Sequence, residues 1–145
     1  MKYCSLILLL IVLTACNQKE EIQITPTLVP EDLINHSQEF KKGVLSFNDA
    51  IHVAIGFSLA NSIMVEAEGG KIIIDTTGTI ETGREVRSIF DRLNPYPIKA
   101  VIYTHNHGDH VFGARAFVDN KDTQVIAHET TEDYINRILG ILRPI

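Results

Sequence analysis

An alternation of hydrophobic and polar residues with a period of two first appears at residues 51–57 and predicts a β-strand there. Residues 61–67 and 71–75 form two further strand-like runs, and Glu68-Gly69-Gly70 separates them. A short turn that contains glycine between two such runs predicts a hairpin. The continuous run Ile72-Ile73-Ile74 is typical of a strand that is covered on both faces.

Beyond residue 80 the pattern alternates between helical and extended periods. Residues 81–93 place Val86, Ile89, Phe90 and Leu93 on one face of a predicted amphipathic helix. The same reasoning predicts a strand at residues 99–103, a helix at 111–118, a strand at 123–127 and a helix at 129–142. Such an order predicts an α/β layered domain whose functional site lies at the carboxyl ends of its strands.

The first residues have the pattern of a secretory signal, with Lys2 followed by an apolar stretch at residues 6–13. Leu13-Thr14-Ala15-Cys16 resembles the bacterial lipobox, which implies cleavage before Cys16 and a diacylglycerol on its sulfur. The alternative is an ordinary signal with an incidental cysteine. We therefore expect a lipoprotein signal peptide at residues 1–15, a lipid-anchored polar tether at 16–42 with a short helix at 31–40, and an ordered domain at 43–145, held at the cell envelope by its membrane anchor.

Composition narrows the choice of chemistry. The 145 residues are enough for one domain of modest size. The only two cysteines are Cys4 and Cys16, so the mature domain has no thiol ligand and any metal site must use histidine and carboxylate. A net charge of −5 without a cluster of lysine and arginine argues against a nucleic-acid partner.

Four potential metal ligands occur within six residues, directly after the apolar run at residues 100–103. In an extended segment the side chains of His105 and His107 point to the same side, so both can bind one metal ion. Asp109 and His110 are adjacent, and a turn after Gly108 would direct both to a second ion. Imidazole and carboxylate are ligands that zinc takes in catalytic sites.

The spacing His105-x-His107-x-Asp109-His110 after an apolar strand, preceded by Ile74-Asp75-Thr76, resembles the metallo-β-lactamase superfamily. Further stretches resemble the zinc-dependent alkyl sulfatases within it. These stretches are Gly56-Phe57-Ser58-Leu59-Ala60-Asn61-Ser62, Tyr103-Thr104-His105, Asp109-His110-Val111-Phe112-Gly113-Ala114-Arg115 and Ile126-Ala127-His128-Glu129. The resemblance runs from about residue 43 to the end of the chain.

The resemblance implies an αβ/βα sandwich, of which this chain holds the N-terminal half, and a site with two zinc ions. His105 and His107 would bind one ion, and Asp109, which is also the candidate catalytic residue, would bind the other with His110. A bridging hydroxide would hydrolyse a small-molecule ester, in this branch a sulfate on an alkyl chain. Asp75 would orient a ligand histidine, or else cap the turn after its strand. The resemblance also allows a homodimer of the full-length protein.

The chain departs from the family pattern after His110. The family needs a bridging carboxylate and a further histidine, and the only later histidine is His128, which we interpret as structural. Half of a sandwich would leave one face of its sheet uncovered. Two alternatives therefore stand beside the alkyl sulfatase: another hydrolase of the superfamily, similar to a β-lactamase or a thioesterase, and a truncated lipoprotein without catalysis.

Overall fold

The structure, a computed structural model, describes residues 29–119 and 121–142 of the chain. The predicted signal peptide and Cys16 lie outside these residues. The chain divides into two units between Ile34 and Asn35. Helix α2 (Glu31–Ser37) and the 3₁₀ helix η1 (Gln38–Phe40) confirm the short helix expected in the tether.

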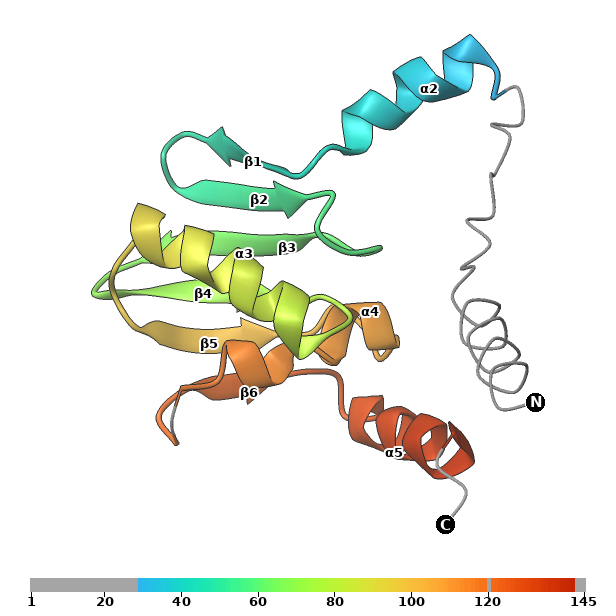
Figure 1. The fold of residues 1–145 in the computed structure, drawn as a ribbon. Helices are drawn as coiled ribbons and strands as arrows, with labels where there is room; N and C mark the ends of the chain where they lie inside the picture. Colours follow the sequence, from blue (N-terminus) through green and yellow to red (C-terminus); the bar gives the residue numbers. More distant parts are fainter. Residues whose placement is uncertain (1–28, 120, 143–145) are drawn as a thin grey trace, which may run out of the picture. The chain divides into compact units, whose positions relative to one another are not determined.

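A single six-stranded sheet, drawn in Figure 1, is the centre of the second unit. Its strands are β1 (Gly43–Phe47), β2 (Ile51–Ile55), β3 (Ser62–Ala67), β4 (Gly70–Ile74), β5 (Ile98–Ile102) and β6 (Gln124–Ile126). The order in the sheet is the order in the chain, with antiparallel pairing from β1 to β4 and parallel pairing from β4 to β6. The predicted hairpin between β3 and β4 is confirmed.

Strand β1 was not predicted from the pattern of hydrophobic and polar residues. The strand is short, begins with Gly43 and has no alternating burial. Its signal lies in the turn to β2, where Asn48 and Asp49 take left-handed φ angles of 50° and 53°. Asparagine and aspartate tolerate this conformation better than other side chains, and two such residues in succession match the right-handed twist of a hairpin.

Helix α3 (Ile80–Leu93) crosses from β4 to β5 over one face of the sheet (Figure 1). It begins at Thr79, whose hydroxyl oxygen accepts a hydrogen bond from the Thr82 N–H at 3.2 Å. Of the predicted apolar face, Val86 and Phe90 are fully buried, whereas Leu93 is 44% exposed. The core under the helix consists of Ala54, Met64, Ile73, Val86, Phe90, Ile98, Val101, Ala116 and Phe117.

The opposite face of the sheet is also apolar but is largely open in the described chain. Because side chains alternate along a strand, Ile73 faces α3 while its neighbours Ile72 and Ile74 face the other way. Ile73 is fully buried, and its two neighbours are only partly buried, so the expected cover on both faces is seen on one face only. Toward the sheet edges this open face carries Leu45, Phe47, Ile51 and Ile126, which are 41–51% exposed.

The continuous helix predicted at residues 111–118 is wrong. The chain forms a short helix α4 (Gly108–Val111) and then a 3₁₀ helix η2 (Ala114–Ala116). Between them Gly113 donates its N–H to the Thr77 carbonyl at 2.9 Å. This bond holds the backbone of Gly113 against the turn after β4. The approach is so close that a Cβ at this position would lie 1.9 Å from the Thr76 carbonyl oxygen.

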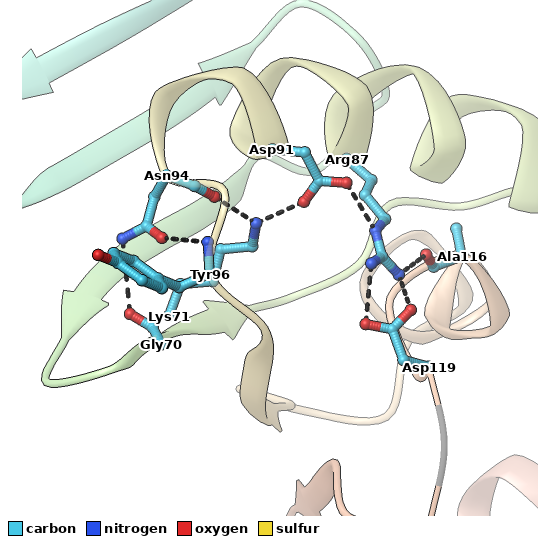
Figure 2. A network of polar contacts seen from close by, with 8 residues as sticks. All are labelled: Gly70, Lys71, Arg87, Asp91, Asn94, Tyr96, Ala116 and Asp119. Carbon is cyan, nitrogen blue, oxygen red and sulfur yellow. Dashed lines mark hydrogen bonds and ion pairs between the residues drawn. The ribbon is translucent and has the colours of Figure 1, made fainter.

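Figure 2 shows the polar network that joins α3 to the sheet and to the segment after η2. Lys71 is 1% exposed, and its ammonium donates to Asp91 and, at 2.7 Å, to the Asn94 carbonyl. Arg87 donates to Asp91 at 3.1 Å and to both carboxylate oxygens of Asp119. A buried lysine is retained here because a carboxylate and a carbonyl oxygen replace its water shell.

The remaining predicted elements are confirmed with small shifts of their ends. Strand β6 follows Thr123, and helix α5 (Thr131–Leu142) begins two residues later than expected. Over the described residues, no helix combines the length and the apolar character that crossing a membrane requires.

Candidate metal centre

The four predicted ligands lie at the carboxyl end of β5. His105 and His107 occupy the loop that follows this strand, and Asp109 and His110 lie in the first turn of α4. Gly108 is the first residue of this helix, and a Cβ there would lie 2.5 Å from the Phe112 ring. The loop sits where parallel strands β4 and β5 end, which is the usual place for a site in an α/β sheet.

The ring of His105 contacts the imidazole rings of both His107 and His110. The ring centroid of His105 lies 4.6 Å from that of His107 and 4.0 Å from that of His110. Asp109 places its Oδ2 at 3.5 Å from Nε2 of His110. The side chains of Asp109 and His110 are 27% and 21% exposed, so the cluster is partly shielded and still open to solvent.

Asp75 anchors this cluster from the end of β4. One carboxylate oxygen, Oδ1, accepts the backbone N–H of Thr104 at 2.9 Å. The other, Oδ2, accepts the Thr104 hydroxyl at 2.7 Å and lies 2.7 Å from Nδ1 of His110. An ionised carboxylate can only accept, so Nδ1 of His110 carries the proton and donates it to Asp75.

The same logic fixes His105. The Thr104 hydroxyl has one proton, which it donates to Asp75, so its oxygen is an acceptor for Nδ1 of His105 at 3.0 Å. In their neutral form both histidines therefore carry the proton on Nδ1, so that Nε2 carries the lone pair. A carboxylate or hydroxyl partner on the far nitrogen is the usual support of a metal-binding histidine.

The backbone of His110 is held as firmly as its ring. Its carbonyl accepts the backbone N–H of Thr76 at 2.7 Å and the Thr76 hydroxyl at 2.9 Å. Asp75 and Thr77 flank Thr76 with left-handed φ angles of 57° and 72°. Such angles are uncommon outside glycine, and they persist where surrounding contacts hold the chain.

These residues have the chemistry of a zinc site, with imidazole nitrogen and carboxylate oxygen as donors. Over residues 29–119 and 121–142, no three or more His, Cys, Asp or Glu side chains are arranged to hold one metal ion. The donors thus fit a metal centre by type, clustering and tautomer, whereas their present rotamers do not form a complete ligand set.

His128 lies apart from the candidate ligands. It is exposed, its Nδ1 accepts the Thr130 N–H at 3.3 Å, and it lies 2.9 Å from the Thr130 hydroxyl. It therefore supports the start of α5, in keeping with the structural interpretation.

His128 also lines a cavity of about 400 Å³, together with Tyr103, Val125, Ala127, Glu129, Thr131, Glu132 and Ile135. Burial raises the pKa of Tyr103, and none of the four predicted ligands lines this cavity.

Sequence reasoning missed three residues of the centre. Thr104 stands inside the predicted motif and could have been found there, since a hydroxyl next to a ligand histidine is a plausible support. Thr76 adjoins Asp75. Ser62 ends one of the stretches that resemble the alkyl sulfatases, but nothing in the sequence indicated its role. It begins β3, is 1% exposed, and donates its hydroxyl to the backbone carbonyl of Asp75 at 2.7 Å.

Comparison with known proteins identifies the class to which this fold and cluster belong. The family model of the metallo-beta-lactamase superfamily matches residues 55–143, more than half of the chain. The chain belongs to the metallo-beta-lactamase superfamily. The α/β fold class predicted from the sequence is confirmed, and membership of this superfamily implies bound metal ions.

Within the superfamily the chain is similar to alkylsulfatases. It is 36% identical over 87 residues to a linear primary-alkylsulfatase of Pseudomonas sp., a match that covers 57% of this chain and 16% of that protein. It is 34% identical over 83 residues to the alkyl/aryl-sulfatase BDS1 of Saccharomyces cerevisiae, covering 57% of this chain and 13% of that protein. The matched part therefore spans about a sixth or less of these relatives.

Solved structures agree with this placement. The stereoselective inverting sec-alkylsulfatase Pisa1 from Pseudomonas sp. superimposes with a TM-score of 0.63 at 29% identity, over 68% of this chain and 16% of that chain. A metallo-beta-lactamase from Hirschia baltica gives a TM-score of 0.57 at 17% identity, over 67% of this chain and 48% of that chain. The second likeness shows the fold alone.

Proposed function

We propose that this chain carries the first metal-binding segment of a zinc-dependent hydrolase that cleaves alkyl sulfate esters. The observation that carries the proposal is the cluster of His105, His107, Asp109 and His110 at the end of β5, with two of the rings held in one tautomer by Asp75 and Thr104. The alkylsulfatase relatives favour a sulfate ester as the substrate class.

In this proposal His105 and His107 hold one zinc ion, and Asp109 and His110 hold a second. Bound zinc supplies a Lewis acid for the ester oxygen and lowers the pKa of water. In the neutral tautomer whose Nδ1 donates to an oxygen acceptor, Nε2 of His105 and of His110 carries the lone pair that a metal ion would take. Asp109, beside His110, is the candidate for accepting or donating a proton during ester cleavage.

The test uses the full 145-residue chain. Zinc is added and then removed from solution by dialysis, the bound zinc is counted, and release of inorganic sulfate from octyl sulfate is followed. We expect the unaltered chain to retain bound zinc after dialysis and His107→Ala to retain less. His36→Ala is the matched control, since His36 is exposed in α2 and contacts Glu39 at 3.4 Å. Zinc content that is equal in the two variants, or absent in the unaltered chain, would refute the proposal.

Two alternatives are outcomes of the same experiment. Bound zinc without sulfate release would favour a metal-binding lipoprotein without catalysis. Cleavage of a β-lactam or a thioester, supplied in place of octyl sulfate, would assign a different substrate class within the superfamily.

We also propose that the mature protein is attached to the cell envelope by a lipid on Cys16. The support is the charged start, apolar stretch and lipobox-like end of residues 1–16. Cells that express the chain and are fed an alkyne fatty acid should yield a labelled protein, and Cys16→Ser should abolish the label. Equal labelling of both proteins would refute attachment at this residue.

A further inference from the structure

The hydroxyl of Ser62 is directed at the backbone of Asp75 and not at any predicted ligand. Ser62 stands at the first position of β3, next to the Ile63–Ile74 pair that joins β3 to β4. It is 1% exposed, and its Oγ donates to the Asp75 carbonyl at 2.7 Å. A buried hydroxyl with a single short bond to a carbonyl fixes the direction of that carbonyl.

That direction matters because Asp75 has a left-handed backbone with φ at 57°. An aspartate tolerates this region better than most residues, but extended or right-handed backbone is still its lower-energy state. Its N–H is already bonded to the Ile102 carbonyl at 2.9 Å, which holds one side of the peptide. The bond from Ser62 orients the carbonyl of the following peptide, whose N–H is bonded to the His110 carbonyl at 2.7 Å. Loss of the hydroxyl therefore removes one of the two bonds that hold this peptide and leaves Asp75 less constrained.

Rotation at Asp75 would affect the whole centre. Its carboxylate accepts from the Thr104 backbone, the Thr104 hydroxyl and Nδ1 of His110 at 2.7–2.9 Å. All three bonds depend on where the Cα–Cβ bond of Asp75 points, which its backbone angles determine. The chain of contacts thus runs from Ser62 through Asp75 to His110.

We propose that Ser62 is a positioning residue, which sets the ring orientation and tautomer of His110 through the backbone of Asp75. The inference rests on the proposed function in one respect, that His110 is a metal ligand. Ser62 then tunes zinc affinity without contacting a metal ligand, through its hydrogen bond to the backbone carbonyl of Asp75.

The test compares Ser62→Ala with Thr123→Ala in the full 145-residue chain. Thr123 is a matched control because its buried hydroxyl also donates to a backbone carbonyl, that of Ile98 at 3.2 Å, at the opposite end of β5. The first readout is the NMR signal of the His110 Nδ1–H without metal. We expect a protected proton in the unaltered chain and in Thr123→Ala, and its loss by exchange with water in Ser62→Ala.

The second readout is the zinc dissociation constant. Because partners of ligand histidines are worth about ten- to a hundredfold in metal affinity, Ser62→Ala should weaken zinc binding by about tenfold. In an Asp75→Ala background the same change should have no further effect, since Ser62 acts through Asp75. Ser62→Cys keeps a similar volume with a weaker donor and should fall between the two, which keeps the inference testable if Ser62→Ala does not fold.

The inference is overturned if Ser62→Ala and Thr123→Ala show the same His110 signal, or if Ser62→Ala weakens zinc binding equally with and without Asp75. Failure of the proposed function gives a different result. In that case the unaltered chain binds no zinc, while the metal-free His110 signal still decides the role of Ser62.

Discussion

Asp75 and Asp109 are both carboxylates of the candidate centre, yet their surroundings give them different tasks. The Asp75 side chain is 9% exposed and is fully used by Thr104 and His110. Asp109 is 27% exposed and has one contact, at 3.5 Å, to His110. The more open carboxylate is the one with lone pairs left for a metal.

A first prediction separates these two tasks. Asp109→Asn removes a charged ligand and should lower zinc content more than Asp75→Asn, which alters only the support of His110. Metal analysis of the two dialysed proteins measures the difference. Equal zinc content in both would contradict the assigned roles.

Gly113 provides a test of the backbone contact behind His110. A methyl group there would lie 1.9 Å from the Thr76 carbonyl oxygen, so Gly113→Ala should lower the free energy of unfolding by about 2–4 kcal/mol. Gly140→Ala is the control, because a Cβ at this position in α5 meets nothing within 4 Å. It should raise stability by about 0.5–1 kcal/mol through helix propensity. Urea unfolding of both variants compares them, and equal midpoints would show that Gly113 is not confined.

Helices and strands with a strong hydrophobic period could be predicted from the sequence, whereas features that depend on contacts between distant residues could not. Strands β2 to β5 and helix α3 follow from runs of apolar residues. The break at Gly113 does not, because the spacing of Val111, Ala114, Phe117 and Val118 fits a helix and the competing bond comes from Thr77. The candidate ligands could be named because they are contiguous in the chain. The role of Ser62 could not be predicted, since a hydrogen bond from a hydroxyl to a distant carbonyl leaves no pattern in the local sequence.

The start of α3 is where one side chain stabilises a whole element. Thr79 caps the helix through Thr82, so Thr79→Ala should lower the free energy of unfolding by about 1 kcal/mol. Thr79→Asp keeps an oxygen acceptor at a helix start and should preserve stability. Thermal unfolding of both variants is the measurement, and an equal loss in both would contradict the capping role.

The junction of α3 with β4 should make stability depend on pH. Partial burial acts to raise the pKa of Asp91, but hydrogen bonds from Lys71 and Arg87 outweigh it and leave that pKa below its ordinary value. A carboxylate with a lowered pKa contributes stability that is present above its unfolded pKa of about 4 and is lost as pH falls further.

We therefore expect Asp91→Asn to lower the urea midpoint at neutral pH, because Lys71 loses its counter-charge. The difference in midpoint from the unaltered chain should become smaller as pH falls below about 4. Glu68→Gln, in the exposed hairpin turn, is the control and should show no such convergence. A constant difference at all pH values would contradict the ion-pair explanation.

At the scale of the molecule, the open face of the sheet is the dominant surface feature. Apolar strands lie under it, and Phe47 and Ile51 form a cross-strand pair on it that is 51% and 41% exposed. Exposed apolar patches of this kind favour association. The 145-residue chain should therefore sediment above its monomer mass of 16.2 kDa in a concentration-dependent way.

Phe47→Lys should reduce this association by placing a charge on the open face. Leu59→Lys is the control, because Leu59 is 92% exposed in the loop between β2 and β3 and is not part of the sheet. If both variants associate to the same degree, the sheet face is not the contact surface.

The agreement between strand order and chain order has a consequence for how this protein forms. Each strand pairs with the one synthesised just before it, so no strand waits for a distant partner and the sheet can grow in one direction. Loop closures stay short for the hairpins, and the helix of the first crossover can form while its strands assemble. Residues 43–74 can thus pair independently of the segment that carries the histidine cluster, and β4 then presents Asp75 as an acceptor for His110.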